Sequence, residues 1–251
     1  GSIGSLVNSG TISSSNYAIY NASIGTLGPI TNSGLIAGMI YNGSSNDITF
    51  NGGSDATFGT LTGSSGGTGS ADIGLLSNPS ANVYFASGNL LLNDNVNVGS
   101  FALRHPGSTL QVNNLVSITG NYAQSTAATL LIGVGDSAVS NGVTADTGYG
   151  RLVVSGAATI DSGSTVALKS LNTYKFATGQ RYVVVTASQN GTNYNAGTLN
   201  YLTSGYNGVT SGSVVDSGST SNLVVTLSTP VTETPGGTTN PTNPTNPGFA
   251  T

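Results

Sequence analysis

The sequence predicts an all-β protein, a right-handed parallel β-helix (β-solenoid), and three observations favour it. The chain of 251 residues repeats itself at an interval of about 20 residues, the length of one coil in such a fold. Its short apolar runs are separated by Gly, Asn and Ser, which form turns well and helices poorly. Only 6% of its residues are charged, so its polar surface is built from neutral side chains.

The repeat is clearest in residues 3–45. Ile3 recurs as Ile24, and residues 19–21 (Ile-Tyr-Asn) recur as residues 40–42, in both cases 21 positions later. One coil cannot bury its apolar side chains alone, so it stacks on its neighbours. We therefore expect four side chains in the shared core, those of Ile12, Ile19, Ile36 and Ile40.

An Asn-Ser-Gly sequence recurs as well, at Asn8 and again at Asn32, 24 positions later. We expect each Asn at a corner of its coil, because Asn tolerates left-handed backbone. Asn8 is also expected to stack on Asn32 in a ladder, as Asn side chains do in cross-β assemblies.

The rest of the chain divides into three parts. Residues 1–120 read as β-helix stalk repeats, interrupted at residues 63–69 (GSSGGTG) by a loop or tight corner. Residues 121–229 have longer alternating strands and larger aliphatic clusters, such as the continuous run at 182–185, and are expected to be better packed and more stable. Residues 230–251 contain Asn-Pro three times, which predicts a disordered, Pro-rich linker without a core of its own.

Three segments in the second half resemble, in order, the C-terminal part of autotransporter passengers of Gram-negative bacteria. They are residues 118–135 (ITGNYAQSTAATLLIGVG), 150–170 (GRLVVSGAATIDSGSTVALKS) and 176–188 (FATGQRYVVVTAS). The resemblance implies a pertactin-like or autochaperone region that folds first outside the cell and templates the coils upstream. It also implies type V secretion through periplasm and outer membrane to the cell surface. The implied partner is the passenger's own outer-membrane β-barrel, which this chain lacks.

The function expected from this resemblance is a non-catalytic stalk that displays an upstream effector and seeds folding during secretion. Two alternatives remain open. The chain could be an adhesin or self-associating module that binds a host surface or another copy of itself. It could also be the stalk fragment of an autotransporter enzyme, a protease or esterase, whose catalytic domain lies upstream.

We predict no catalytic residue within the chain. Gly135-Asp136-Ser137 is similar to the opening of GDSL-type esterases, but that chemistry needs a His held in an Asp-x-x-His sequence. The single histidine is His105, and position 102 is Ala. His105 lies in an Arg-His-Pro-Gly turn sequence, which predicts an exposed loop histidine. Residues 63–67 match Gly-x-Ser-x-Gly, but without the flanking strand and helix of a nucleophile elbow.

Cofactors, metals and nucleic acid are not expected as ligands. Residues 66–73 approximate a calcium-binding GGxGxDxU repeat, but the Asp is displaced by one position and the motif does not recur. The chain has no Cys, and its five Lys and Arg residues are scattered, so no basic patch neutralises phosphates.

Overall fold

The computed structural model describes residues 1–229, and the linker predicted for residues 230–251 lies outside them. The described residues form 21 strands and two short 3₁₀ helices. The predicted all-β class is therefore confirmed. Nineteen of the strands belong to one mixed sheet, and the other two, β1 and β4, pair with each other.

The strands in the first half are β1 (Ser2–Ile3), β2 (Leu6–Asn8), β3 (Thr11–Asn21), β4 (Thr26–Leu27), β5 (Ile30–Asn32), β6 (Leu35–Asn42), β7 (Ile48–Asn51), β8 (Gly59–Thr62), β9 (Gly74–Ser77), β10 (Val83–Ser87), β11 (Asn89–His105) and β12 (Thr109–Val112). Those in the second half are β13 (Leu115–Gln124), β14 (Thr129–Val134), β15 (Arg151–Val154), β16 (Ala158–Ile160), β17 (Thr165–Ser170), β18 (Arg181–Ser188), β19 (Asn200–Thr203), β20 (Val209–Ser217) and β21 (Thr220–Ser228). The 3₁₀ helices are η1 (Ser70–Asp72) and η2 (Ala196–Thr198).

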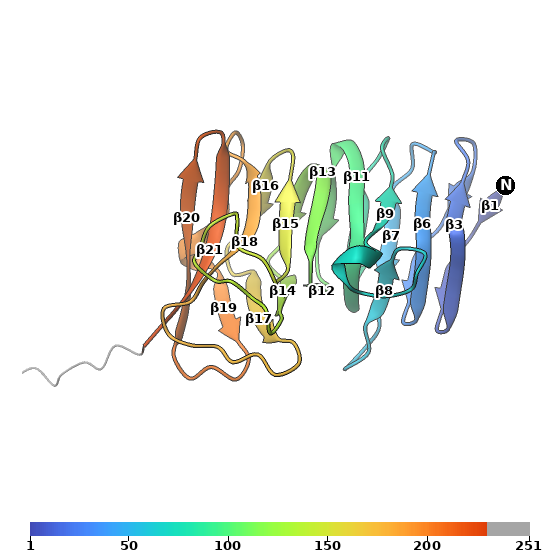
Figure 1. Cartoon of the computed structure of the whole chain (residues 1–251). Coiled ribbons are helices and arrows are strands. Elements are labelled where there is room, and N and C mark those ends of the chain that lie inside the picture. Colours follow the sequence, from blue (N-terminus) through green and yellow to red (C-terminus); the bar gives the residue numbers. More distant parts are fainter. Residues whose placement is uncertain (230–251) are drawn as a thin grey trace, which may run out of the picture.

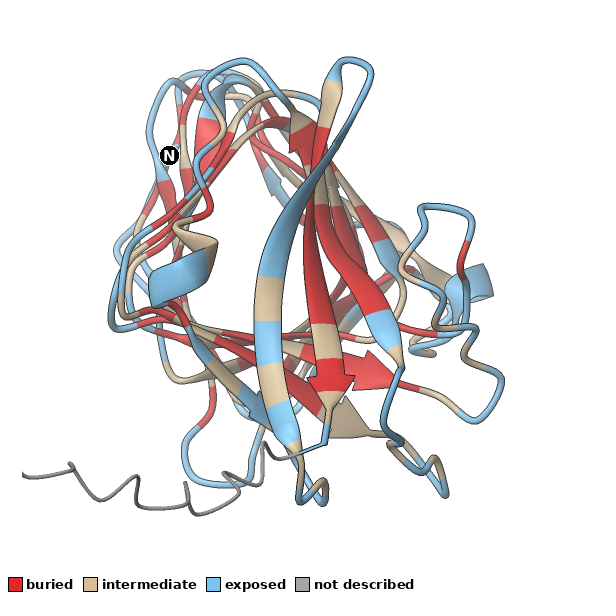
Figure 2. Cartoon of the chain, turned by 90° about the vertical axis from the view of Figure 1, so that its left-hand side faces the viewer, coloured by how far each residue is buried: buried red, intermediate tan, exposed pale blue. Residues whose placement is uncertain are grey.

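Parallel pairing between segments that follow one another along the chain dominates the sheet. β3 pairs with β6, β6 with β8 and β9, β11 with β13, β13 with β15, and β14 with β17, all in parallel. Figure 1 shows the strands side by side, broadly in chain order from the N-terminal end, until the opposite end, where β21 lies between β18 and β20. Seen end-on in Figure 2, the chain surrounds an interior that buried residues line.

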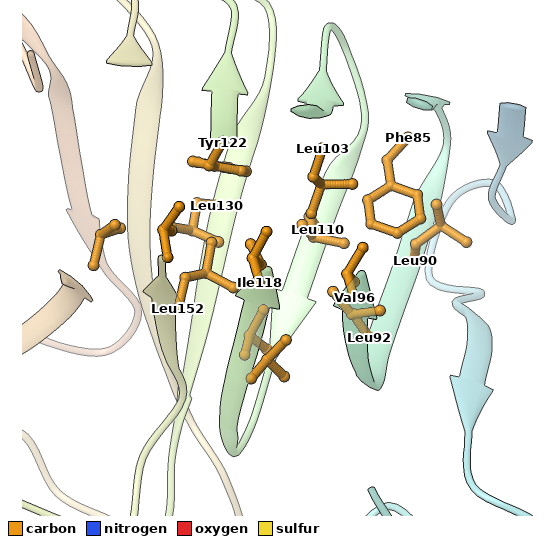
Figure 3. Packing of buried hydrophobic residues seen from close by; sticks show 14 of the residues in the cluster. Phe85, Leu90, Leu92, Val96, Leu103, Leu110, Ile118, Tyr122, Leu130 and Leu152 are labelled. Atoms are coloured by element: carbon orange, nitrogen blue, oxygen red, sulfur yellow. The ribbon is translucent and has the colours of Figure 1, made fainter. Parts of the chain in front are cut away.

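The core follows from this register, because equivalent apolar residues fall in rows across neighbouring strands. Leu90 pairs with Leu110, Leu110 with Leu130, and Leu130 with Val166, and all four are fully buried. Figure 3 shows three of these leucines within the same packed interior as Phe85 and Tyr122. Such rows bury each side chain against the strands before and after it, as expected of stacked repeats.

The isoleucines predicted for the core lie in or against it. Ile36 and Ile40 are fully buried, and Ile19 is almost so. Ile12 is only half-buried, because β3 pairs with a single strand, β6, and no strand within residues 1–229 covers its other edge. The prediction is thus confirmed for three of the residues and in part for Ile12.

The last strands depart from the parallel arrangement expected for residues 121–229. β21 pairs antiparallel with both β18 and β20. A turn with Gly218 in the left-handed region (φ +60°) joins β20 to β21. Two residues suffice to connect antiparallel strands, whereas parallel strands need a crossover of a dozen or more. The short connection at residues 218–219 therefore dictates an antiparallel hairpin.

The corner conformation expected for Asn8 and Asn32 is wrong. The non-glycine residues with positive φ among residues 1–229 are Asp55, Asn172 and Asn195. The Gly of the repeated Asn-Ser-Gly instead serves close stacking of backbone, since a Cβ added at Gly34 would overlap the carbonyl oxygen of Gly10. Glycine is required there because it lets one repeat approach the previous one.

Candidate functional site

Buried asparagine ladders connect neighbouring strands, as predicted for Asn8 and Asn32. Asn8 Nδ2 donates to Asn32 Oδ1 at 2.8 Å. A second, longer ladder was not predicted, although the repeated Ile-Tyr-Asn carried its signal. Asn21 Nδ2 donates to Asn42 Oδ1 at 2.6 Å, and Asn42 Nδ2 donates to Asn78 Oδ1 at 2.9 Å. These side chains hold successive strands in register inside a region where water cannot replace a lost partner.

Replacing Asn42 with alanine should therefore destabilise the N-terminal half by about 3 kcal/mol, because it leaves buried amides without partners. We expect faster hydrogen exchange in β3, β6 and β9, with β17 unchanged. Asn16→Ala is the control, since the Asn16 side chain is exposed. Equal exchange in the two variants would show that the ladder contributes nothing to stability.

His105 is buried, so the prediction of an exposed loop histidine is wrong. It ends strand β11, and its ring is fully enclosed. Nε2 lies 2.8 Å from the Ser108 carbonyl oxygen, which only accepts, so Nε2 carries the proton. Nδ1 lies 3.0 Å from the Tyr122 hydroxyl. Burial lowers the pKa of His105 to about 4, so the imidazole is neutral at physiological pH.

Ser137 lies in a different environment from His105. It is exposed in the loop that follows β14, whereas His105 is enclosed by β11 and β13. Both ring nitrogens of His105 already face other partners. The structure therefore does not bring the two residues together as a nucleophile and its base.

The loop at residues 63–73 matches the prediction for the Gly-Ser-rich segment, and its acidic residue is engaged locally. Asp72 Oδ1 accepts from the Ser65 hydroxyl at 2.6 Å, and Asp72 Oδ2 accepts from the Gly69 N–H at 3.1 Å. Within residues 1–229, no group of three His, Cys, Asp or Glu residues is gathered to hold a metal ion. In the structure, the carboxylate of the calcium-like sequence closes a turn.

A hollow in the described part of the chain lies between this loop and the loop at residues 135–150. We call it the interloop groove. Its volume is about 760 Å³, and it is lined by residues 68–70, 113–115, 146–149 and 171–172 together with Gly135, Ser137 and Arg151. Figure 1 shows the turn containing η1 and the loop after β14 standing out from the same side of the strands.

The 135–150 wall of the interloop groove is fixed by two charged side chains. Asp146 Oδ2 accepts the backbone N–H groups of residues 141–143 at 2.8–3.1 Å. Arg151, which is buried, donates four hydrogen bonds of 2.6–3.0 Å, to the backbone oxygens of Thr144, Asp146 and Val183 and to the Tyr149 hydroxyl. Both charged groups therefore have their hydrogen-bond partners within the wall. These bonds hold the loop in one conformation before any ligand binds.

The opposite wall is tied to the strands by asparagines. Asn114 Nδ2 donates to the Thr68 carbonyl at 2.9 Å and to Asn93 Oδ1 at 2.7 Å. Asn93 Nδ2 in turn donates to the Gly69 carbonyl at 3.2 Å. These bonds connect the tip of the loop to β11 and to the segment between β12 and β13.

A buried carboxyl that the sequence did not single out lies in β11. Asp94 is fully buried, and by strand alternation it shares the face of Leu92 and Val96 in the core. Neither carboxyl oxygen has a hydrogen-bond partner in residues 1–229. The nearby Gly74 amide favours the charged form of Asp94, but its geometry is not that of a hydrogen bond to either carboxyl oxygen. Burial dominates and raises the pKa of Asp94 to about 8.

The sequence matches no protein-family model and has no significant match among curated proteins. No helix in residues 1–229 is long and apolar enough to cross a membrane.

Proposed function

We propose that the chain is a right-handed parallel β-helix that serves as the non-catalytic stalk of an autotransporter passenger. The observation that carries this proposal is the ordered series of parallel pairings, in which each segment stacks on the previous one. Crossovers between parallel strands of one sheet are right-handed in about 98% of cases, which supports the handedness. The three segments that resemble autotransporter passengers support the family.

The distribution of burial supports a folding seed in residues 121–229. β18 and β21 are almost continuously buried, including residues 182–185 and 223–225. β3, at the other end, is mostly exposed or half-buried. Because each coil gains stability from its neighbours, a well-packed end provides the edge on which weaker coils pair. The pair of β18 and β21 supplies such an end, whereas β20 on its outer side is mostly exposed.

A stalk of this kind displays an effector on the bacterial surface, and its partner is an outer-membrane β-barrel. The placement of Ser137 and His105 in separate environments supports a non-catalytic role for this chain. The absence of a charge cluster at the interloop groove agrees with a scaffold whose surface is neutral.

Export of the chain as a passenger tests the proposal. The chain is placed between a secretion signal and the β-barrel of an autotransporter in a Gram-negative bacterium. We expect a folded passenger on intact cells, detected by protease accessibility and surface antibody labelling. The variant Val184→Asp should lose most of this display, because the seed core is disrupted. Retention of the wild-type passenger inside the cell, or undiminished display of the variant, would contradict the proposal.

A further inference from the structure

We propose that the interloop groove is a binding site for a neutral oligosaccharide. This goes beyond the stalk function, because the stalk itself would then bind a ligand, at the interloop groove on its side, in addition to displaying an effector. Four features of the groove support the proposal: its charge, its free hydrogen-bonding groups, its apolar floor and its rigidity.

The charge of the groove excludes ionic ligands. Asp146 and Arg151 are the charged residues of its lining, and they cancel. The Arg151 guanidinium already donates to four oxygens, and the Asp146 carboxylate already accepts three backbone N–H groups. A phosphate or carboxylate ligand needs free cationic donors, and a cationic ligand needs a free carboxylate. The groove offers neither.

The groups that remain free in the groove are neutral and polar. The hydroxyls of Ser70 and Ser137 and the amide of Asn172 make no hydrogen bond to other residues of the described chain, and all three residues are exposed. Hydroxyls and amides both donate and accept hydrogen bonds. Sugar hydroxyls do the same, so they satisfy this set. A purely apolar ligand would instead leave these groups desolvated and unpaired.

An apolar floor complements the C–H face of a sugar ring. Leu115 is 49% exposed and Leu171 is half-buried, and both line the groove. The volume of about 760 Å³ falls in the range of pockets that enclose drug-sized ligands. It therefore suits an oligosaccharide better than a single sugar. Both walls are held by the hydrogen bonds described above, which reduces the ordering cost of binding.

Binding of the labelled full chain to an array of neutral oligosaccharides, with sialylated and sulfated counterparts alongside, tests this proposal. We expect binding to neutral glycans. The double variant Ser70→Arg/Ser137→Arg places two long cationic side chains across the groove. It should raise the Kd for the best neutral glycan at least tenfold by calorimetry. Ser64→Arg/Ser162→Arg is the matched control, because it adds the same charge at exposed serines outside the groove, and its Kd should stay within twofold.

A milder variant keeps the test independent of folding. Asn172→Gly preserves the left-handed backbone at φ +55° while removing the side-chain amide. It should weaken binding several-fold, and circular dichroism should show an unchanged fold. The proposal is overturned if no neutral glycan binds, if only charged glycans bind, or if the double variant binds as well as the unsubstituted chain.

Discussion

Replacing Val184 with aspartate is expected to prevent the whole described chain from folding. Val184 is fully buried in β18, within the core that β21 closes. A carboxylate there is buried without a partner and costs several kcal/mol. Ile12→Asp should unravel only the first strands, because Ile12 is half-buried in β3 and its carboxylate can reach water.

Limited proteolysis and hydrogen exchange on the full chain distinguish these outcomes. In the unsubstituted protein we expect the slowest exchange in β18 and β21 and the fastest in β1, β2 and β3. Val214→Asp is the matched control, since Val214 is 47% exposed in β20 and should leave folding unchanged. If the protease-resistant core mapped to residues 1–120 and the second half were digested first, the folding seed would not lie in residues 121–229.

The free energy of unfolding should depend on pH in two stages, because Asp94 and His105 titrate in opposite senses. The pKa of Asp94 is raised from 3.8 to about 8, so the folded state holds a proton that the unfolded state releases between these values. This makes stability fall as pH rises from about 4 to 8. The pKa of His105 is lowered from 6.5 to about 4, so the unfolded state binds the extra proton there. This makes stability rise from pH 4 to 6.5.

The two effects on the free energy of unfolding have slopes of equal size and opposite sign, about 1.4 kcal/mol per pH unit for one proton. Between pH 4 and 6.5 they cancel, and we expect a plateau. Between pH 6.5 and 8 only Asp94 acts, and stability should fall by about 2 kcal/mol. Urea unfolding followed by circular dichroism measures this directly, since the chain has no Trp for fluorescence.

Single substitutions separate the two groups. The free energy of unfolding of Asp94→Asn should not change with pH above 6.5 and should fall as pH drops from 6.5 to 4, because only His105 then contributes to the pH dependence. His105→Gln should lose stability steadily from pH 4 to 8, because only Asp94 remains. If the Asp94→Asn variant still lost stability above pH 6.5, another group would be the cause of that decline.

The sequence by itself determined the structural features that recur from one repeat to the next. The spacing of Ile, Asn and Gly residues predicted the all-β class, the core positions Ile36 and Ile40, and the Asn8–Asn32 ladder. These predictions succeeded because stacking places each residue on its equivalent in the neighbouring repeat, so the period of the sequence becomes a contact in space. The right-handed coil and the autotransporter resemblance remain proposals.

Structural features whose residues do not recur in the repeats were decided by the tertiary structure. His105 lies in a turn-like sequence, yet packing against Tyr122 buries it. Asp94 stands in a run of Asn residues, and only strand alternation shows that it faces the core. The short connection explains why β21 is antiparallel to β20, but its antiparallel pairing with β18 depends on where the hairpin docks.

The interloop groove is the clearest case, because its walls come from residues 63–73 and 135–150. The sequence shows that the first of these is a loop, but not the side of the molecule from which either loop emerges. That direction depends on the register of the strands beneath them and on hydrogen bonds such as those of Arg151. The sequence therefore determined the repeating interior, and only the tertiary structure decided where insertions meet on the surface, because their contacts are neither local nor periodic.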